Sequence, residues 1–256
     1  VEAGKHLMCE KPCGVDVAEV EEIIAACDQA NVQFMDGVMF MHSDRLTKVR
    51  EVIEDGESIG KLRRIATQFS FSAPEEFLTE NIRMHSDLEP LGCLGDLGWY
   101  NIRFTLWAMN YQMPQAVTGR MLNATGRSDS PRPVPTEFSG ELLFDEEVSA
   151  SFYCSFLTEH QQWAHLSGTN GSLRVDDFVL PYYGNNLGFT VSNPVFDCDV
   201  CDFHMERHER QVTSDEYANS HKTSQETKLF RNFSSLALSG TPDSHWPEIA
   251  LQTQRV

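Results

Sequence analysis

The chain has 256 residues, 41% of them hydrophobic, which is long enough to bury a substantial core in one or two domains. Its 38 Asp and Glu residues against 20 Lys and Arg give a net charge of −18, which argues against nucleic acid or an anionic membrane surface as the main partner. No apolar run approaches the roughly 20 residues of a membrane span. The seven cysteines, an odd number, fit reduced thiols, so we expect a cytoplasmic protein without a disulfide framework.

The beginning of the chain predicts a parallel β–α–β unit. Residues 6–9 read as a short buried strand that ends at Glu10-Lys11-Pro12, because proline cannot continue a ladder. Lys11 then lies at the carboxyl end of a strand, where ligands bind in open α/β sheets. A capped helix with an apolar face follows over residues 16–31, and residues 32–37 form the next strand, which gives a right-handed crossover.

His42 follows the second strand on the same side as Lys11 and is a candidate substrate contact. A lone histidine in a loop is more often a surface or capping group, and both interpretations stay open. Ser43 begins a second helix that residues 56–60 end. The hydrophobic period then changes from helical to two, and residues 65–71 are predicted to be a strand with one buried face.

The stretch Leu91–Asn110 is the centre of the prediction, because three glycines at spacing three lead into an amphipathic helix. Asp96 suits the first turn, where a carboxylate caps free N–H groups, and Tyr100 follows one turn later on the same face. The helix is either a core element whose Asp96 and Tyr100 only cap and pack, or one wall of a site that uses a phenol and a carboxylate together.

The remaining pattern indicates a largely antiparallel sheet and then two helices. Asn170-Gly171 predicts a type I′ hairpin turn. One helix is expected from Ser224 to Gly240, and Pro247 suits the first turn of a final helix. The expected strands are 117–122, 138–144, 148–156, 163–168 and 172–175.

A possible metal site lies in the sequence Cys198-Asp-Val-Cys201-Asp-Phe-His204-Met-Glu-Arg-His208. Zinc fingers place about a dozen residues between the cysteine pair and the histidine pair so that the chain can fold back, and only two residues intervene here. A redox CxxC is not favoured either, since the motif does not open a helix after a strand. We therefore expect no metal.

Several segments in this order, AGKHLMCEKP, MDGVMFMH, IGKLRRIATQFSF, GCLGDLGWY, GTNGSLRVDDFVLP and HWPEIALQTQ, resemble the Gfo/Idh/MocA oxidoreductases. The similarity is greatest to plant and algal members of the dihydrodiol or xylose dehydrogenase-like branch. The resemblance implies that Lys11 and Tyr100 are catalytic, with Asp96 beside them, and that Glu10, Lys11 and Pro12 border the cofactor. His42, Arg83 and Phe178 are candidates for lining the substrate pocket, the last two more weakly supported.

The resemblance implies an α/β fold: a remnant of a doubly wound parallel (Rossmann) sheet over residues 1–57, then an α+β domain with a largely antiparallel open sheet over residues 58–256. The chain departs from the family pattern because it contains no G-x-G-x-x-G turn. We expect that the N-terminal part of the Rossmann domain is missing and that the last helix is truncated.

The expected activity, from the resemblance, is hydride transfer between NADP or NAD and the carbinol carbon of a sugar, polyol or cyclic diol. Tyr100 would be the acid and base, and Lys11 would lower its pKa from the usual value of about 10. These residues alone are expected to be inactive, and the protein is expected to be a homodimer or higher homo-oligomer. The alternative is a truncated, non-catalytic oligomerisation module, against which the intact Lys11, Asp96 and Tyr100 argue.

Overall fold

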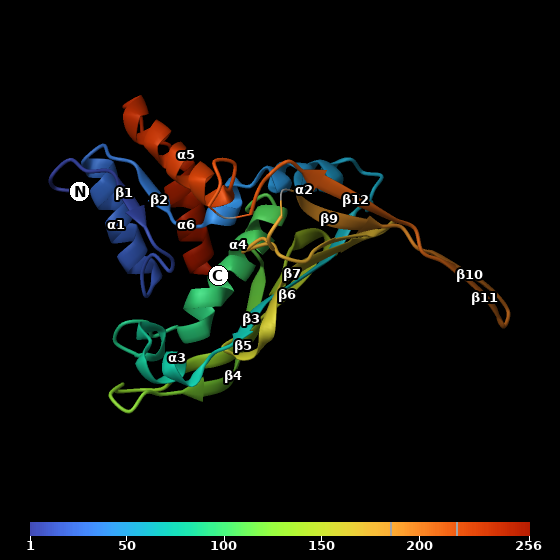
Figure 1. Ribbon diagram of the computed structural model, residues 1–256, viewed down its shortest axis with the longest axis horizontal. Helices are drawn as coiled ribbons and strands as arrows, with labels where there is room; N and C mark the ends of the chain where they lie inside the picture. Colours follow the sequence, from blue (N-terminus) through green and yellow to red (C-terminus); the bar gives the residue numbers. More distant parts are fainter. Residues whose placement is uncertain (185, 219) are drawn as a thin grey trace.

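The computed structural model describes residues 1–184, 186–218 and 220–256, leaving aside the side chain of residue 146. A small N-terminal unit and two C-terminal helices lie together at one end of a large curved sheet (Figure 1). A long hairpin projects from the other end of the sheet. Helix α4 (Trp99–Ala108) crosses the inner face of the sheet and packs against β3 and β6.

The N-terminal unit is the predicted β–α–β unit. Strand β1 (Leu7–Cys9) pairs in parallel with β2 (Phe34–Asp36), and α1 (Val17–Gln29) connects them. The predicted cap is confirmed: the Asp16 carboxylate accepts a hydrogen bond from the Glu19 amide at 3.0 Å, and the Glu19 carboxylate accepts one from the Val15 amide at 2.7 Å. The turn η1 (Met39–His42) and helix α2 (Asp44–Glu54), capped by Ser43 as predicted, follow.

The large sheet has eight strands in the order β12-β9-β8-β7-β3-β6-β5-β4. All neighbours are antiparallel except β3 and β6, which run in parallel, so the predicted largely antiparallel sheet is confirmed. The strands are β3 (Leu62–Ser72), β4 (Ala116–Thr125), β5 (Val134–Leu143), β6 (Ser149–Ser155), β7 (Leu157–Gly168), β8 (Ser172–Val175), β9 (Leu187–Ser192) and β12 (Glu209–Ser214).

The prediction of an amphipathic central helix is wrong. Every residue of α4 except Trp107 is buried, because the helix is enclosed between the sheet and the C-terminal helices. The enclosure includes a charge: the fully buried Arg103 guanidinium binds the Asp36 carboxylate at 2.6 Å and Thr253 Oγ1 at 2.7 Å. These bonds connect α4 to β2 and to the last helix, and they satisfy a group that would otherwise be costly to bury.

The two predicted C-terminal helices are confirmed as α5 (Gln225–Ser239), capped by Ser224 and ended by Gly240, and α6 (His245–Arg255). Helix α6 packs on the N-terminal unit, where Met35, Trp246 and Ile249 form an apolar cluster. The two-part division at residues 57 and 58 stays a prediction. The main apolar core contains residues from both parts.

The Asn170-Gly171 hairpin forms between β7 and β8, but its predicted type I′ geometry is wrong, because neither residue has a positive φ. The loop is held by long-range bonds instead: the Asn170 amide donates to the Ile59 carbonyl at 2.9 Å, and the Thr169 amide donates to the Lys61 carbonyl at 3.0 Å. Helix α3 (Glu75–Glu80) and the strands from β9 to β12 are additions to the predicted elements.

Within the described ranges, no helix has both the length and the apolar character that crossing a bilayer requires.

Candidate active site

Three elements bring a cluster of charged side chains together. Lys11 comes from the end of β1, Asp96 from the π-helical turn η3 (Leu94–Gly98), and Arg83 from the short turn η2 (Ile82–Met84). Lys11 Nζ donates to Asp96 Oδ1 at 2.5 Å and also to the Asp96 main-chain carbonyl, and Arg83 Nε lies 2.7 Å from the same Oδ1. Asp96 thus binds two cations at one carboxylate oxygen. The predicted helix-capping role of Asp96 is wrong, because its partners are these side chains.

Tyr100 completes the cluster from the first turn of α4. Lys11 Nζ lies 4.6 Å from the centroid of the Tyr100 ring, within the range of a cation–π contact. Phe69 packs edge-on against the same ring at 5.6 Å, and Phe40 lies at 6.2 Å. The predicted neighbours Lys11, Asp96 and Tyr100 are therefore in contact across 85 residues of sequence.

The pKa values of Tyr100 and Lys11 differ from the expectation that the lysine lowers the pKa of the phenol. Burial, followed by the nearby Asp96 charge, raises the pKa of the Tyr100 phenol. Burial lowers the pKa of the Lys11 ammonium, while Asp96 opposes that change. The prediction that Lys11 lowers the tyrosine pKa is not what this geometry gives, because burial and the Asp96 charge both raise the pKa of Tyr100.

These groups line one part of a pocket of about 320 Å³. Most of the other walls are apolar or aromatic, and His160 on β7 adds one imidazole. A pocket with apolar walls and a few convergent polar groups is the usual form of a small-molecule site. The full lining is Lys11, Met39, Phe69, Phe71, Arg83, Asp96, Leu97, Tyr100, His160, Val179 and Leu180.

Two predicted site residues lie elsewhere. The His42 ring stacks on Trp246 at 4.7 Å, and burial lowers the pKa of His42 to about 4. Phe178 is a core residue, with ring centroids 5.6 Å from Phe40 and 5.1 Å from Phe104. Neither lines the pocket of Lys11 and Tyr100. Met39 and Val179, which lie near them in sequence, do line it.

The predicted cofactor segment lies at the carboxyl ends of both parallel strands. The Gly37 amide donates to the Cys9 carbonyl at 2.8 Å and continues the pairing of β1 with β2. A Cβ on Gly37 would lie 3.1 Å from the Glu10 carboxylate, so the two strand ends approach closely. The Lys11–Pro12 peptide bond is cis.

Glu89 is a further charged group that the sequence did not single out. Burial raises the pKa of the Glu89 carboxyl to about 7, and the charges of Asp96, Lys11 and Arg83 act on it. Its Oε1 accepts the Leu91 amide at 3.3 Å, and a Cβ on Gly95 would clash with it. The glycine at position 95 is the only sequence signal that a side chain approaches there.

The loop before the turn is fixed by Gly92. This residue has φ +49°, and a Cβ there would clash with the Pro135 carbonyl of β5. A glycine is therefore needed for the loop to approach the sheet, and this approach positions the turn that carries Asp96.

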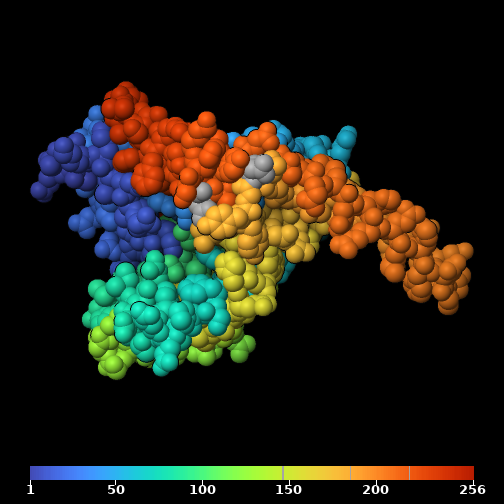
Figure 2. All heavy atoms as spheres, viewed as in Figure 1, coloured from blue at the N-terminus to red at the C-terminus, as the bar shows by residue number. Residues whose placement is uncertain are grey.

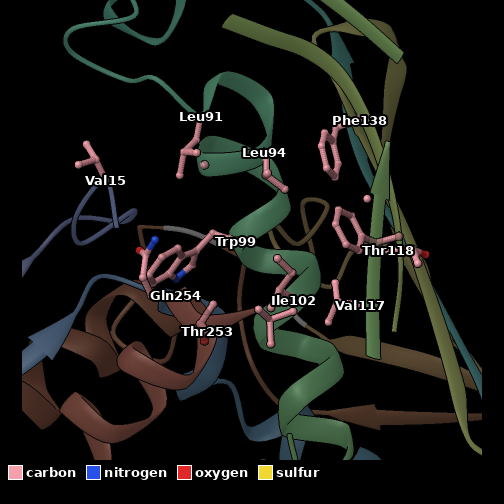
Figure 3. A pocket seen from close by; sticks show the side chains of 14 residues that line it. Val15, Leu91, Leu94, Trp99, Ile102, Val117, Thr118, Phe138, Thr253 and Gln254 are labelled. Atoms are coloured by element: carbon pink, nitrogen blue, oxygen red, sulfur yellow. The ribbon is translucent and has the colours of Figure 1, made fainter. Parts of the chain in front are cut away.

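A second, apolar pocket of about 300 Å³ opens beside η3 (Figure 3). Leu94, Ile102 and Phe138 line it, and Trp99 and Thr253 lie on the side of α6. Its lining contains none of the charged cluster, so the candidate active site is the pocket around Lys11 and Tyr100.

The cysteine and histidine motif lies on the projecting hairpin of β10 (Val195–Asp199) and β11 (Asp202–Glu206). The Nε2 atoms of His204 and His208 each lie 2.7 Å from the Glu206 carboxylate, and both cysteines are exposed. Among residues 1–184, 186–218 and 220–256, no three His, Cys, Asp or Glu side chains are grouped to hold a metal ion.

Comparison with known proteins gives a family and a fold. The family model described as the GFO/IDH/MocA C-terminal domain matches residues 46–174, just over half of the chain. Trans-1,2-dihydrobenzene-1,2-diol dehydrogenase of Mus musculus is 30% identical over 181 residues, which are 70% of this chain and 50% of that protein. A dTDP-3,4-didehydro-2,6-dideoxy-alpha-D-glucose 3-reductase of Streptomyces violaceoruber is 28% identical over 194 residues, or 75% of this chain and 53% of that protein.

Solved structures share the fold. A 3-ketoreductase from Actinomadura kijaniata, crystallised with NADP and TDP-benzene, has a TM-score of 0.77 at 22% identity, with 99% of this chain and 69% of that chain covered. Aldose-aldose oxidoreductase from Caulobacter crescentus, complexed with glycerol, has a TM-score of 0.75 at 22% identity, covering 99% and 68%. The chain spans about half the length of the curated relatives it matches.

Proposed function

Because the chain belongs to the Gfo/Idh/MocA family, we propose that it is the substrate-binding and acid–base part of an oxidoreductase that uses NADP or NAD. The reaction is hydride transfer at the carbinol or carbonyl carbon of a cyclic diol or sugar. The observation that carries the proposal is the contact of Lys11 with Asp96 and with the Tyr100 ring at the edge of a pocket. The named activities of the relatives support it.

The acid–base step belongs to Tyr100. Its raised pKa keeps the phenol protonated near neutral pH, so Tyr100 is poised to donate its proton to the oxygen of a carbonyl that receives a hydride. In the reverse direction the phenolate takes the proton of the carbinol hydroxyl, and this direction gains rate as pH rises. The chemistry that a bound nicotinamide supplies is the hydride itself.

Lys11 and Asp96 act on the substrate oxygen. The Lys11 ammonium, held by Asp96 at 2.5 Å, is positioned to donate a hydrogen bond to the same oxygen and stabilise negative charge that develops there. Asp96 fixes the direction of the lysine, and Arg83 shares the carboxylate at 2.7 Å. When a substrate binds, its oxygen then takes the place of one of the partners in this hydrogen-bond network.

The cofactor fits the carboxyl ends of the parallel strands β1 and β2, where Glu10, Lys11 and Pro12 lie beside Gly37. The close approach of Gly37 to the Glu10 carboxylate leaves no room for a side chain at position 37. These residues would hold the nicotinamide end. The pyrophosphate requires a glycine-rich turn, which the 256 residues do not contain.

The residues that line the pocket favour a cyclic diol over an open-chain polyol as the substrate. Met39, Phe69, Phe71, Val179 and Leu180 offer apolar surface, and a substrate with many hydroxyl groups would leave several of them without hydrogen bonds. The relatives named as dihydrodiol dehydrogenases support this choice. The sugar alternative is supported by the relative named as a dTDP-sugar reductase.

The test compares substrates with the complete gene product that contains these residues. Cyclic trans-1,2-diols and free aldoses are supplied with NADP and then with NAD, and the reduced nicotinamide is followed by its absorbance. We expect a higher kcat/KM for the cyclic diols. Activity with aldoses alone would contradict the substrate assignment, and no activity with either class would contradict the proposed function.

A further inference from the structure

Two cysteines flank Lys11 in the sequence. Cys9 is the last residue of β1 and Cys13 follows four residues later, so the segment Cys9-Glu10-Lys11-Pro12-Cys13 has one thiol on each side of the lysine. The segment belongs to the N-terminal unit, which lies at the surface of the molecule (Figure 2). Neither thiol has a role in the proposed acid–base step.

The side chains of these two cysteines lie close together. Cys9 Sγ lies 3.8 Å from the main-chain carbonyl oxygen of Cys13, and the two thiols are within hydrogen-bonding reach of each other. Cys9 is half-buried, whereas Cys13 is 5% exposed and packs in the apolar core. In such a pair the accessible thiol reacts with a reagent from solution, and the buried thiol then reacts with the product.

The surroundings make Cys9 the more acidic of the two thiols. The hydrogen bond from Cys13 lowers the pKa of Cys9, although burial and the carboxylates of Asp36, Glu10 and Glu19 act in the opposite direction. The same hydrogen bond, together with burial, raises the pKa of Cys13 well above its usual range. Because the thiolate is the nucleophile, Cys9 is the sulfur that attacks first.

A second close pair of cysteines differs in access. The sulfur atoms of Cys93 and Cys154, which we call the buried pair, lie 3.9 Å apart, but both residues are fully buried. Burial raises the pKa of the Cys154 thiol well above its usual range. Thiols in such surroundings are inert, so the buried pair is an internal control for a reaction that needs an accessible thiolate.

Both ends of the segment around Lys11 are fixed in the fold. The Cys9 carbonyl accepts the Gly37 amide at 2.8 Å as part of the pairing of β1 with β2. Cys13 is held in the core, and the cap of α1 begins two residues later. A covalent S–S bond is about 2.05 Å long, much shorter than a hydrogen bond between two thiols. Bonding the two sulfurs therefore shifts residues 10–12, of which Lys11 is the middle one.

We propose that Cys9 and Cys13 are a reversible oxidation site, at which hydrogen peroxide converts the two thiols into a disulfide that moves Lys11 away from Asp96. The Cys9 thiolate attacks one peroxide oxygen: an S–O bond forms, the O–O bond breaks, and the hydroxide that leaves takes up a proton to give water. The Cys13 sulfur then attacks the Cys9 sulfur: the S–S bond forms, the S–O bond breaks, and the hydroxide that leaves takes the Cys13 proton. The two thiols lose two electrons, and the peroxide is reduced to two molecules of water.

The disulfide acts on the reaction through Lys11, and this consequence rests on the proposed function. Lys11 Nζ lies 2.5 Å from Asp96 Oδ1 and the lysine side chain is 6% exposed, so a displaced Lys11 leaves the substrate oxygen and becomes accessible to solvent. A displacement of about 1 Å can cost about 100-fold in rate. We expect oxidation to lower turnover at least about 10-fold. A dithiol reductant, itself oxidised to its disulfide, should restore the turnover by thiol–disulfide exchange.

The first test reads the disulfide by mass spectrometry. It uses the complete gene product with Cys198→Ser and Cys201→Ser, which remove the two exposed thiols of the projecting hairpin. Cleavage after glutamate separates residues 3–10 from residues 11–19, so only a disulfide can keep these two peptides joined. After treatment with hydrogen peroxide and blocking of free thiols by iodoacetamide, we expect the joined peptides and no joined peptides from the buried pair. Separate peptides 3–10 and 11–19 would overturn the proposal.

The second test reads the position of Lys11 and the turnover. Acetic anhydride should modify Lys11 faster in the oxidised protein than in the reduced protein, and dithiothreitol should reverse both this change and the loss of turnover. Cys13→Ala is the matched control, because it keeps the Cys9 thiol but cannot form the disulfide, so peroxide should leave the acetylation rate of Lys11 unchanged.

Two further outcomes separate this proposal from the proposed function. Joined peptides with an unchanged acetylation rate of Lys11, or with unchanged turnover, would overturn the displacement of the lysine. A reduced enzyme without turnover would contradict the proposed function alone, because the peptide masses and the acetylation rate are measured without a substrate.

Discussion

Lys11 is a buried cation whose position depends on Asp96. Its side chain is 6% exposed and that of Asp96 is 10% exposed, so little solvent is present to screen the pair. In such a site the loss of one partner leaves an uncompensated charge, which costs more than the pair contributes.

Asp96→Asn should therefore lower the free energy of unfolding by about 3 kcal/mol. Arg83→Gln, which removes a half-buried partner of the same carboxylate, should cost about 1 kcal/mol or less. Urea denaturation at pH 7 measures both. A smaller loss for Asp96→Asn than for Arg83→Gln would show that the lysine is not held in this way.

Glu89 should make stability depend on pH near neutrality. Its pKa is raised from 4.5 to about 7, so the folded state binds this proton more tightly than the unfolded state. Stability is therefore full below about pH 4.5 and falls as pH rises through 7, by about 3 kcal/mol in all.

Glu89→Gln should remove this decrease and make the protein more stable than the wild type at pH 8. The difference between urea midpoints at pH 5 and pH 8, for the two proteins, is the measurement. An unchanged pH dependence in the variant would show that another group titrates.

At the scale of elements, the loop from Gly92 to η3 determines where Asp96 lies. Gly92→Ala adds a methyl group that meets the Pro135 carbonyl and also requires an alanine at φ +49°. We expect a loss of about 2 kcal/mol in stability together with a lower kcat. Gly56→Ala is the matched control, because that glycine also has a positive φ but has open space around it. Equal losses of stability in the two variants would show that the whole effect comes from the positive φ and none of it from the contact with Pro135.

Local patterns predicted the elements that local chemistry controls. The cap of α1 by Asp16 and Glu19, the alternation on β6 and the end of α5 at Gly240 are set by residues close in sequence. The character of α4 depends instead on distant partners: Arg103 is buried only because Asp36 lies 67 residues away in sequence and β2 brings it near. No periodicity shows that contact, and the predicted amphipathic helix failed for this reason.

The prediction of the site also succeeded for local features and failed for contacts between residues distant in sequence. Lys11 at a strand end was readable from Glu10-Lys11-Pro12, whereas its contact with Asp96 crosses 85 residues and was implied by resemblance. Met39 and Val179 line the pocket in place of His42 and Phe178. Which residue of each segment faces the pocket depends on the turn η1 and on the aromatic packing of Phe40. Glu89 had no local signal beyond Gly95.

At the scale of the whole molecule, these 256 residues hold an acid–base cluster without a glycine-rich phosphate turn. They should bind NADP and NAD no more tightly than about 1 mM, because the turn and the helix N-terminus normally hold the pyrophosphate. Isothermal titration of a monodisperse preparation measures this. Micromolar binding would show that other residues hold the pyrophosphate. Tight binding without turnover would instead favour the non-catalytic alternative.

The most direct measurement is the turnover of Tyr100→Phe in the complete gene product, with a cyclic trans-diol as substrate and the cofactor dissociation constant determined in parallel. The account predicts a 10²- to 10⁴-fold lower kcat, since one proton-transfer group is lost, with the dissociation constant changed less than about 2-fold. Tyr111→Phe, a second tyrosine whose pKa is raised by burial but which lies outside the pocket, should keep wild-type turnover. Wild-type turnover in Tyr100→Phe would contradict the assignment of the acid–base role.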